Sequence, residues 1–388
     1  MTTILPEGGG NGFPLKFQGE VTGTYPFFKV SDMNNEGNET RMFVANNYIS
    51  DITRKTLGAT IFAENSIVFA KVGAAIFLER KRILAQPSCL DNNMTAFELD
   101  DKKADYRYVH HRLIHTRLSD LVSTTALPSL SGNVLSQIKF PLPMLEEQRA
   151  IASALSDVDV LLTEIDRLIA KKRDIQQATM QQLLTGQRRL PGFSDKWEMK
   201  RLGDVASLNR FNIIPFATPD KTFVHFSLPA FDEGKRPVRE PGAAIGSNKF
   251  SVPANAILVS KLNPRIPRVW LPQDIPTNAV ASTEFLVLTP RDGVTREFLY
   301  VVCKSSSFCA QMELAATGTT GSHQRISPGS ALGLSVNVPS EKSEQSAIAT
   351  ILFDMDTEIA SLESRLEKTR QLKQGMMQEL LTGRVRLV

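Results

Sequence analysis

Two stretches of the chain carry apolar residues on a narrow stripe, spaced alternately by three and four positions. This 3.5-residue spacing is typical of a coiled-coil seam, whereas a helix on a broad core has a wider apolar face. Each stretch predicts a helix of about 40 residues, about 60 Å long at 1.5 Å per residue. We expect the stripe residues to mediate helix pairing and subunit contact; they are Leu155, Val158, Leu162, Ile165 and Ile169 in the first stretch and Leu352, Met355, Ile359, Leu362 and Leu366 in the second.

The two stretches are copies of one sequence. Glu147–Gly186 aligns with Glu344–Gly383 without a gap, and "MQQLLTG" near the middle of the chain matches "MQELLTG" near its end. In both copies the glycine after "LLT" suits a left-handed helix C-cap. One such stripe alone would also fit a surface helix of a globular domain. Because the two stripes share one phase, we expect each helix to pair with the other.

The sequence before each helix repeats more faintly. Ser66–Ile76 resembles Ala256–Ile266, which places Lys71 opposite Lys261. Short β-rich runs such as "AILVSKL" and "EFLVLTP", interrupted by Pro and Gly, predict modest strands in a mixed α/β fold. We therefore expect two globular domains and two long helices, arranged as an internal repeat with pseudo-twofold symmetry. The expected segments are a first domain 1–143, a long helix 144–190, a second domain 191–339 and a long helix 340–388.

Composition excludes some classes of protein. The 388 residues contain no apolar run long enough to span a membrane, and the N-terminal sequence does not resemble a signal peptide. The three cysteines form no CxxC pair, so we expect reduced thiols and a cytoplasmic location. The net charge of +4 is compatible with nucleic-acid binding and does not establish it.

The sequence offers no recognisable catalytic site. An adenine methyltransferase needs a D/N-P-P-Y/F turn, and a serine hydrolase of the α/β type needs G-x-S-x-G; neither motif is present. "GGGNG" at Gly8–Gly12 is better explained as a flexible tail than as a phosphate loop. His111 and His115 have helical i,i+4 spacing but no further ligands, so we expect a solvated helix face there. We therefore predict no catalytic residue, no metal site and no cofactor bound by this chain.

Recognition chemistry is better represented. Arg and Lys suit guanine edges and phosphates, whereas Asn and Gln suit adenine edges. Two segments of the second domain, "SKLNPRIPRVW" and "GTTGSHQRIS", supply the candidate DNA contacts Lys261, Asn263, Arg265, Arg268, Ser322, His323, Gln324 and Arg325. The matching places in the first domain supply Lys71, Asn92, Asn93, Ser131 and Asn133. Each of these residues taken singly would also fit an ordinary turn or a solvated loop.

Several of these segments resemble the specificity subunits of type I restriction-modification systems. "LPMLEEQRAIASALSDVDVLL", "LLTGQRRLPGF" and Trp197 followed by "RLGDVA" are similar to the central conserved region of that family. "EQSAIATIL" through "LLTGRVRL" is similar to its distal conserved region. "YPFFKVSDMN" with "DNNM", and "ILVSKLNPRIPRVWL" with "STEF", resemble two classes of target-recognition domain. The resemblance covers nearly the whole chain.

That resemblance implies a non-catalytic subunit that binds double-stranded DNA. Each target-recognition domain would recognise one half of a split, asymmetric site, and the antiparallel helix pair would act as a spacer. Methylation subunits using S-adenosylmethionine would clasp the helices and methylate adenine N6. Restriction subunits using ATP and Mg would add translocation and cleavage, so that the whole complex, rather than this chain, is the enzyme.

The start of the sequence departs from the family pattern. Family members often begin with a W…LG segment like Trp197–Gly203, and this sequence opens directly at "LPEGGGNGFPLKF". We therefore expect the first domain to start late or to lack an edge element of the second.

Two other functions are alternatives: a coiled-coil scaffold with two protein-binding heads, and a self-contained DNA methyltransferase or nuclease. A scaffold would not explain the matched Lys71 and Lys261 segments, and an enzyme would need motifs that we do not find.

Overall fold

The computed structural model describes residues 7–122, 128–139, 141–318 and 324–387. The chain divides into two compact units. Unit 1 contains residues 1–166 and 365–388, and unit 2 contains residues 167–364.

Two long helices dominate the secondary structure. They are α4 (Leu145–Leu184) and α10 (Lys342–Thr382), and each contributes residues to both units. Gly186 and Gly383 follow the helices with φ of 72° and 77°, a left-handed conformation that residues with a Cβ rarely adopt. The two predicted helices and their glycine caps are confirmed.

Unit 1 is built on two small sheets. The larger has the order β1-β8-β5-β6-β3 and the smaller β4-β2-β7. Its strands are β1 (Glu7–Gly9), β2 (Tyr25–Phe28), β3 (Arg41–Met42), β4 (Tyr48–Ile49), β5 (Ile67–Ala70), β6 (Lys81–Leu84), β7 (Cys89–Leu90) and β8 (Met94–Phe97). Its shorter helices are α1 (Asp51–Leu57), α2 (Tyr106–His115) and α3 (Gly132–Leu135), with 3-10 turns η1 (Leu15–Phe17), η2 (Val30–Asn34), η3 (Ala74–Leu78) and η4 (Leu118–Leu121).

The core of unit 1 joins the globular domain to the long helices. The side chains of β5 and β8 are buried along their whole length, as expected for central strands whose two faces are covered. They pack with α2 and with the start of α4, and the end of α10 adds Met377, Leu380 and Leu381 to the same core. The "LLTG" end of one helix therefore completes the domain that precedes the other helix.

Unit 2 contains three sheets, of order β10-β18-β15-β16, β11-β14-β17-β12-β13 and β19-β9. Its strands are β9 (Trp197–Arg201), β10 (Ala206–Asn209), β11 (Asn212–Ile213), β12 (Thr222–Phe226), β13 (Val238–Pro241), β14 (Lys249–Ser251), β15 (Ile257–Ser260), β16 (Val269–Trp270), β17 (Ala279–Ser282), β18 (Phe285–Pro290) and β19 (Ser335–Pro339). Its shorter helices are α5 (Leu202–Val205), α6 (Leu228–Asp232), α7 (Arg296–Lys304), α8 (Ser306–Leu314) and α9 (Pro328–Leu332), with 3-10 turns η5 (Pro215–Ala217) and η6 (Gly242–Ala244).

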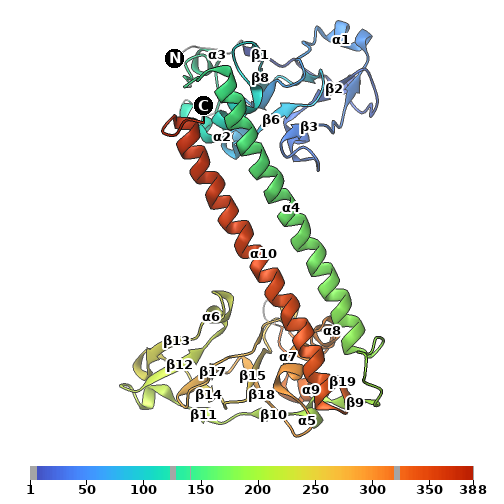
Figure 1. Ribbon diagram of the computed structural model, residues 1–388, viewed down its shortest axis with the longest axis vertical. Coiled ribbons are helices and arrows are strands. Elements are labelled where there is room, and N and C mark those ends of the chain that lie inside the picture. The colour runs from blue at the N-terminus through green and yellow to red at the C-terminus, as the bar shows by residue number, and fades with distance from the viewer. Residues whose placement is uncertain (1–6, 123–127, 140, 319–323, 388) are drawn as a thin grey trace. The chain divides into compact units, whose positions relative to one another are not determined.

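The two units follow one plan. The sheet order β1-β8-β5-β6 in unit 1 corresponds to β10-β18-β15-β16 in unit 2. In both units a helix follows the second of these strands, α2 after β8 and α7 after β18, and a short helix, α3 or α9, precedes the long one (Figure 1). Leu183 and Leu184 of α4 enter the core of unit 2, just as Leu380 and Leu381 of α10 enter that of unit 1. The faint repeat before each helix is thus confirmed as a structural repeat.

Within each unit α4 and α10 run antiparallel (Figure 1). In unit 1 Lys373 pairs with Asp159 and Arg370 with Asp166. In unit 2 Lys172 pairs with Glu358 and Arg173 with Glu363. All ten stripe residues are buried or half-buried. The expectation of an antiparallel helix pair in a mixed α/β fold is confirmed.

Two expectations for unit 1 are wrong. His111 is buried rather than solvated, because α2 turns this face toward the long helices, and only His115 of the i,i+4 pair is exposed. Residues Glu7–Gly9 are not a flexible tail; they form strand β1, which pairs with β8. Gly10 continues from this strand against the backbone of Asp91, so close that a Cβ would lie 1.9 Å from the Asp91 carbonyl oxygen.

The edge element anticipated for the second domain is present. Strand β9, which carries the "W" of the W…LG segment, pairs antiparallel with β19 in unit 2. In unit 1 segment 137–143 precedes α4 as β19 precedes α10 in unit 2, and the described residues of this segment form no strand. Among the described residues, no helix is long and apolar enough to cross a membrane.

Candidate nucleic-acid interface

A glutamate and a glutamine in the first turn of each long helix connect that helix to its surroundings. In unit 2 the side chain of Gln345 is fully buried. Its Oε1 accepts the backbone N–H of Thr295, the N-cap of α7, at 2.8 Å. Its Nε2 donates to the carbonyls of Gly293 and Pro339 at 2.8 and 3.0 Å. One amide thus fixes the start of α7 and the end of β19 to α10.

Unit 1 repeats this arrangement. Oε1 of the buried Gln148 accepts the backbone N–H of Asp105, the N-cap of α2, at 2.9 Å. Its Nε2 donates to the carbonyls of Lys103 and Pro143 at 3.1 and 2.9 Å. The same three backbone groups are satisfied in both units, so the globular domain is attached to its helix in the same way twice.

The neighbouring glutamates hold the end of the opposite helix. Glu344 is 1% exposed and accepts two hydrogen bonds from Arg189 at 2.7 and 2.9 Å. Glu147 is equally buried and binds Arg386 in the same two-point manner, and this contact raises the pKa of the arginine. Each arginine follows the "LLTG" turn that ends a long helix. These residues repeat in the sequence, but no sequence pattern indicates their role.

The candidate contacts of the second domain lie where β15 ends. The backbone N–H of Lys261 donates to Glu284 O at 2.9 Å, and Lys261 O accepts from Ile326 at 3.0 Å. Asn263 N–H donates to Gln324 O at 2.8 Å. The structure therefore brings together the two segments that the sequence nominated, "SKLNPRIPRVW" and the loop before α9. Ser322 and His323 lie outside the described residues.

The arginines of this site differ in their partners. Arg325 donates through Nε to Glu284 at 3.1 Å, and Arg268 makes two hydrogen bonds to Asp232 at 2.7 and 3.0 Å. Arg265 is exposed, and we find no ion pair for it among the described residues. Asn263 adopts φ of 48°, and no hydrogen bond of its buried Oδ1 is found in the described part of the chain. Both carboxylates are distant from the arginines along the chain, so no local sequence pattern indicates these pairs.

The first domain has the same backbone arrangement with other side chains. Lys71 N–H donates to Asn93 O at 2.8 Å, and Lys71 O accepts from Leu130 at 2.9 Å. Asn93 is half-buried and its side chain donates to Asp91 at 3.3 Å, whereas Asn92 is exposed. Burial raises the pKa of Asp91, and the hydrogen bonds from Asn93 oppose that effect.

Two further candidates of the first domain lie at the start of α3. The hydroxyl of Ser131 caps the helix by accepting the backbone N–H of Val134 at 3.4 Å. Asn133 is exposed in the first turn. Lys71 and Lys261 are thus equivalent residues. The backbone of each one joins the turn before β8 or β18 to the loop before α3 or α9. This geometry presents polar side chains on a rigid backbone, the arrangement that base recognition requires.

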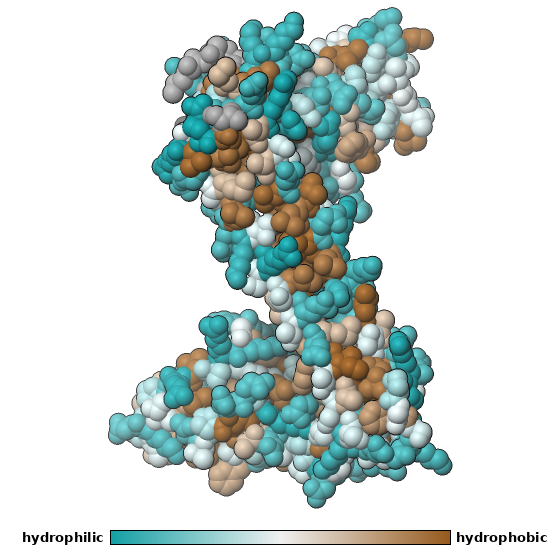
Figure 2. Space-filling view, in the orientation of Figure 1, coloured by the Kyte–Doolittle hydropathy of each residue, from teal (hydrophilic) through white to brown (hydrophobic). Residues whose placement is uncertain are grey.

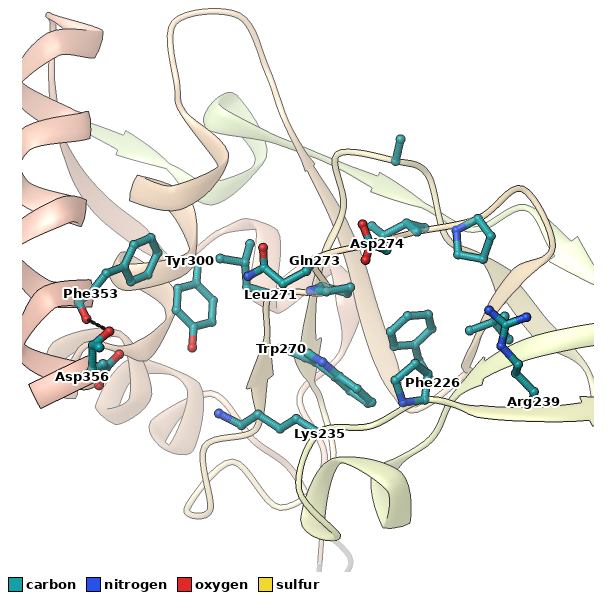
Figure 3. A pocket seen from close by; sticks show the side chains of 17 residues that line it. Phe226, Lys235, Arg239, Trp270, Leu271, Gln273, Asp274, Tyr300, Phe353 and Asp356 are labelled. Carbon is teal, nitrogen blue, oxygen red and sulfur yellow. Dashed lines mark hydrogen bonds between the residues drawn. The ribbon is translucent and has the colours of Figure 1, made fainter. Parts of the chain in front are cut away.

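Unit 2 also has a cleft of about 920 Å³ between its globular domain and α10. Figure 3 shows Trp270 and Tyr300 in its wall, with Lys235 and Arg239 on the α6–β13 side and Asp356 on α10. Asp356 already binds Lys304 and Gln176, each at 2.8 Å. The cleft contains aromatic side chains and charges of both signs, and its titratable groups do not form a nucleophile–base pair. Among the described residues no group of His, Cys, Asp and Glu could hold a metal ion.

Comparison with known proteins gives a consistent result. Residues 7–173 and 194–371 each match the type I restriction modification DNA specificity domain. The chain is 23% identical over 404 residues to the Type I restriction enzyme MjaVIII specificity subunit of Methanocaldococcus jannaschii, covering 95% of this chain and 88% of that protein.

Solved structures share the fold. The crystal structure of the type I restriction-modification system S subunit from M. genitalium has a TM-score of 0.59 at 13% identity, over 98% of this chain and 94% of that one. A chain from a study of complex assembly and conformational transition of the type I restriction-modification system has a TM-score of 0.54 at 16% identity, over 97% and 95%. With two matched regions that cover most of its length, this chain belongs to the family of type I restriction-modification DNA specificity proteins.

Proposed function

We propose that this chain is the specificity subunit of a type I restriction-modification complex and recognises a bipartite, asymmetric DNA site. The observation that carries the proposal is the pair of equivalent segments after β5 and β15. Their backbone hydrogen bonds agree at Lys71 and Lys261, whereas the side chains around them differ. Two domains of one plan with different contact residues would recognise two different half-sites.

In this proposal the exposed side chains contact bases and the paired ones hold the surface in shape. Arg265 is the strongest candidate for a guanine or phosphate contact in the second half-site, because its guanidinium is exposed. Arg268 and Arg325 would position the segment through Asp232 and Glu284. In the first half-site Asn92 and Asn133 are the exposed candidates.

The long helices would bind methylation subunits, and restriction subunits would join the same complex. Apolar side chains lie exposed on the long helices (Figure 2). In unit 2 these include Leu168 and Ile175, seven residues apart on one face of α4 and outside the stripe that faces α10. Exposed apolar surface of this kind favours a protein partner.

The chemistry would belong to the partner subunits. They would use S-adenosylmethionine for adenine N6 methylation, and ATP with Mg for translocation and cleavage, in the cytoplasm where chromosomal DNA is accessible. A scaffold with two protein-binding heads is less well supported, because it does not account for two matched polar segments. A self-contained methyltransferase or nuclease is less well supported as well, since the family to which the chain belongs is that of specificity proteins.

The test is to express the chain with its methylation subunits in cells that lack other adenine methylation and to sequence the methylome. We expect one motif made of two different half-sites separated by a fixed gap. Arg265→Ala should relax or abolish recognition at one position of one half only. Absence of any sequence-specific methylation by the assembled complex would contradict the proposal.

A further inference from the structure

Unit 1 exposes two large apolar side chains in the segment between β5 and β6. Phe77 and Leu78 end the 3-10 turn η3 and are 55% and 56% exposed. The residue before them, Ile76, is buried in the core of the unit. Adjacent exposed apolar residues of this size indicate a binding surface.

This turn is held at both ends. At its start Gly73, with φ of 80°, donates its N–H to Pro128 O at 2.8 Å. At its end the Glu79 carboxylate accepts from the N–H groups of Leu118 and Ser119 at 3.2 and 2.8 Å, and also binds Lys81. Burial alone would raise the pKa of Glu79, but the hydrogen bonds from Lys81 and Ser119 outweigh it and bring the pKa to about 2. Phe77 and Leu78 are therefore presented on a fixed backbone.

The turn occupies the position of the arginine-rich segment of unit 2. Gly73 and Asn263 both have a positive φ, and both donate to the loop before the short helix, Gly73 to Pro128 and Asn263 to Gln324. The residues that follow are Ala74–Leu78 in unit 1 and Pro264–Arg268 in unit 2. This segment is a 3-10 turn that exposes Phe77 and Leu78 in unit 1, whereas in unit 2 it is an irregular loop that exposes Arg265 and Ile266.

We propose that Phe77 and Leu78 contact thymine C5-methyl groups in the major groove of the first half-site, an inference that rests on the proposed function. The thymine methyl is the apolar feature of a major-groove base edge, and aromatic or aliphatic side chains recognise it by contact. Asn92 lies beside Asn93, whose carbonyl binds Lys71 at the start of the same segment. Because an asparagine amide suits adenine, the exposed Asn92 is a candidate contact for an adenine of the same half-site.

The flanking residues favour DNA over a protein partner on this surface. Arg80 follows the turn and Lys71 precedes it, and both are half-buried rather than fully buried. Cations on both sides of an apolar contact suit a base edge between two phosphate backbones. Arg80 is held by Asn34, which keeps this charge beside the turn.

The test uses the complete complex with its methylation subunits and the duplex that its methylome defines. Thymines of the first half-site are replaced one at a time by deoxyuridine, which removes only the methyl group, and affinity is measured by fluorescence anisotropy at one salt concentration. We expect at least one replacement to weaken binding of the unmodified protein by about 4-fold or more. Phe77→Ala or Leu78→Ala should weaken binding to the thymine duplex and remove the sensitivity to that uracil. Phe77→Leu should restore part of it.

A matched control is Ile52→Ala, which removes another exposed apolar side chain of unit 1, 79% exposed on α1. This variant should keep both affinity and uracil sensitivity. The inference is overturned if the unmodified protein tolerates uracil at every first-half position. It is also overturned if Phe77→Ala and Leu78→Ala bind normally, if they weaken binding without changing the response to uracil, as a minor-groove wedge would, or if they block only assembly with the methylation subunits. A complex that recognises no specific duplex at all contradicts the proposed function itself.

Discussion

The two units agree where each long helix begins and differ where each domain presents its candidate DNA contacts. At the helix starts Gln148 and Gln345 satisfy three equivalent backbone groups, and Glu147 and Glu344 each bind an equivalent arginine after the end of the opposite helix. In the segments after β5 and β15 only the backbone bonds agree. There one unit exposes Phe77 and Leu78, and the other exposes Arg265 beside Ile266.

This difference has a physical cause. A buried amide that satisfies three backbone groups cannot be replaced without leaving those groups unpaired, at a cost of about 1–3 kcal/mol each. An exposed side chain on a fixed turn contributes little to folding, so it can change freely. The two units therefore share one framework and differ in the surface that carries the candidate contacts.

The largest effect is expected from removing one half of the repeat. Residues 1–192 contain the first domain and α4 but lack Met377, Leu380 and Leu381, which complete the core of unit 1. A second copy can supply Leu183 and Leu184 in their place, and its Arg189 can bind Glu147. We expect a dimer with twofold symmetry that, with methylation subunits, modifies a palindrome of the first half-site. Light scattering at micromolar concentration and methylome sequencing test this; a monomer, or modification of the original asymmetric site, would contradict it.

Substitution of the two helix-start glutamines tests whether the two domains are attached to their long helices equally strongly. Gln148→Leu and Gln345→Leu each leave one N–H and two carbonyls unpaired, so each should lower the free energy of unfolding of its own unit by about 3 kcal/mol or more. Hydrogen exchange should accelerate at the Asp105 amide in the first variant and at the Thr295 amide in the second. Gln371→Leu, an exposed position on α10, is the control and should change neither. Clearly unequal losses would show that the two attachments are not equivalent.

Acidic pH should lower the stability of unit 1 more than that of unit 2. His110 and His111 are buried in unit 1, and burial lowers the pKa of both from 6.5 to about 4. Below pH 6.5 the unfolded chain binds protons that the folded unit does not, so stability is complete above 6.5 and falls as the pH drops toward 4. Between pH 7.5 and 5 the loss should be about 2 kcal/mol for each histidine.

The equivalent positions of unit 2 are Tyr300 and Val301, which do not titrate in this range. Among its described residues unit 2 has one histidine whose pKa is lowered by burial, His225, against two in unit 1, so unit 2 should lose less protection. Hydrogen exchange at the two pH values compares the units in one experiment. His111→Val copies Val301 and should remove about half of the acid sensitivity of unit 1. An equal loss of protection in both units would argue against the histidines as its source.

The smallest effect concerns the two arginines at the second-domain site. Arg265→Ala should weaken binding of the cognate duplex by about 1–3 kcal/mol if the side chain contacts a guanine edge. Arg325→Ala should cost less, because Arg325 donates to Glu284 in the absence of DNA and must give up or share that bond. Affinities measured across a salt series separate base contacts from phosphate contacts, since a phosphate contact lowers the salt slope by about one. A larger loss for Arg325→Ala would reverse the assignment.

The sequence by itself determined the features that depend on local and periodic signals. Heptad spacing and the "LLTG" glycines were sufficient to predict two helices. A helix of a coiled coil buries an apolar side chain about every 3.5 residues, and a helix commonly ends at a residue that adopts the left-handed conformation. The repeat further predicted their pairing and the equivalence of Lys71 and Lys261. Resemblance to a known family added the direction of pairing and the function.

Only the tertiary structure decided which polar groups are engaged and which are free. Arg325 meets Glu284 and Arg268 meets Asp232 across tens of residues of chain, so no local pattern could distinguish them from the exposed Arg265. The i,i+4 spacing of His111 and His115 predicted a solvated helix face, but His111 is buried because α2 packs against the long helices. Gln148 and Gln345 are ordinary polar residues in sequence, and only the chain segments that fold around them make each one the attachment of a domain to its helix, because a buried amide must find partners wherever the fold supplies them.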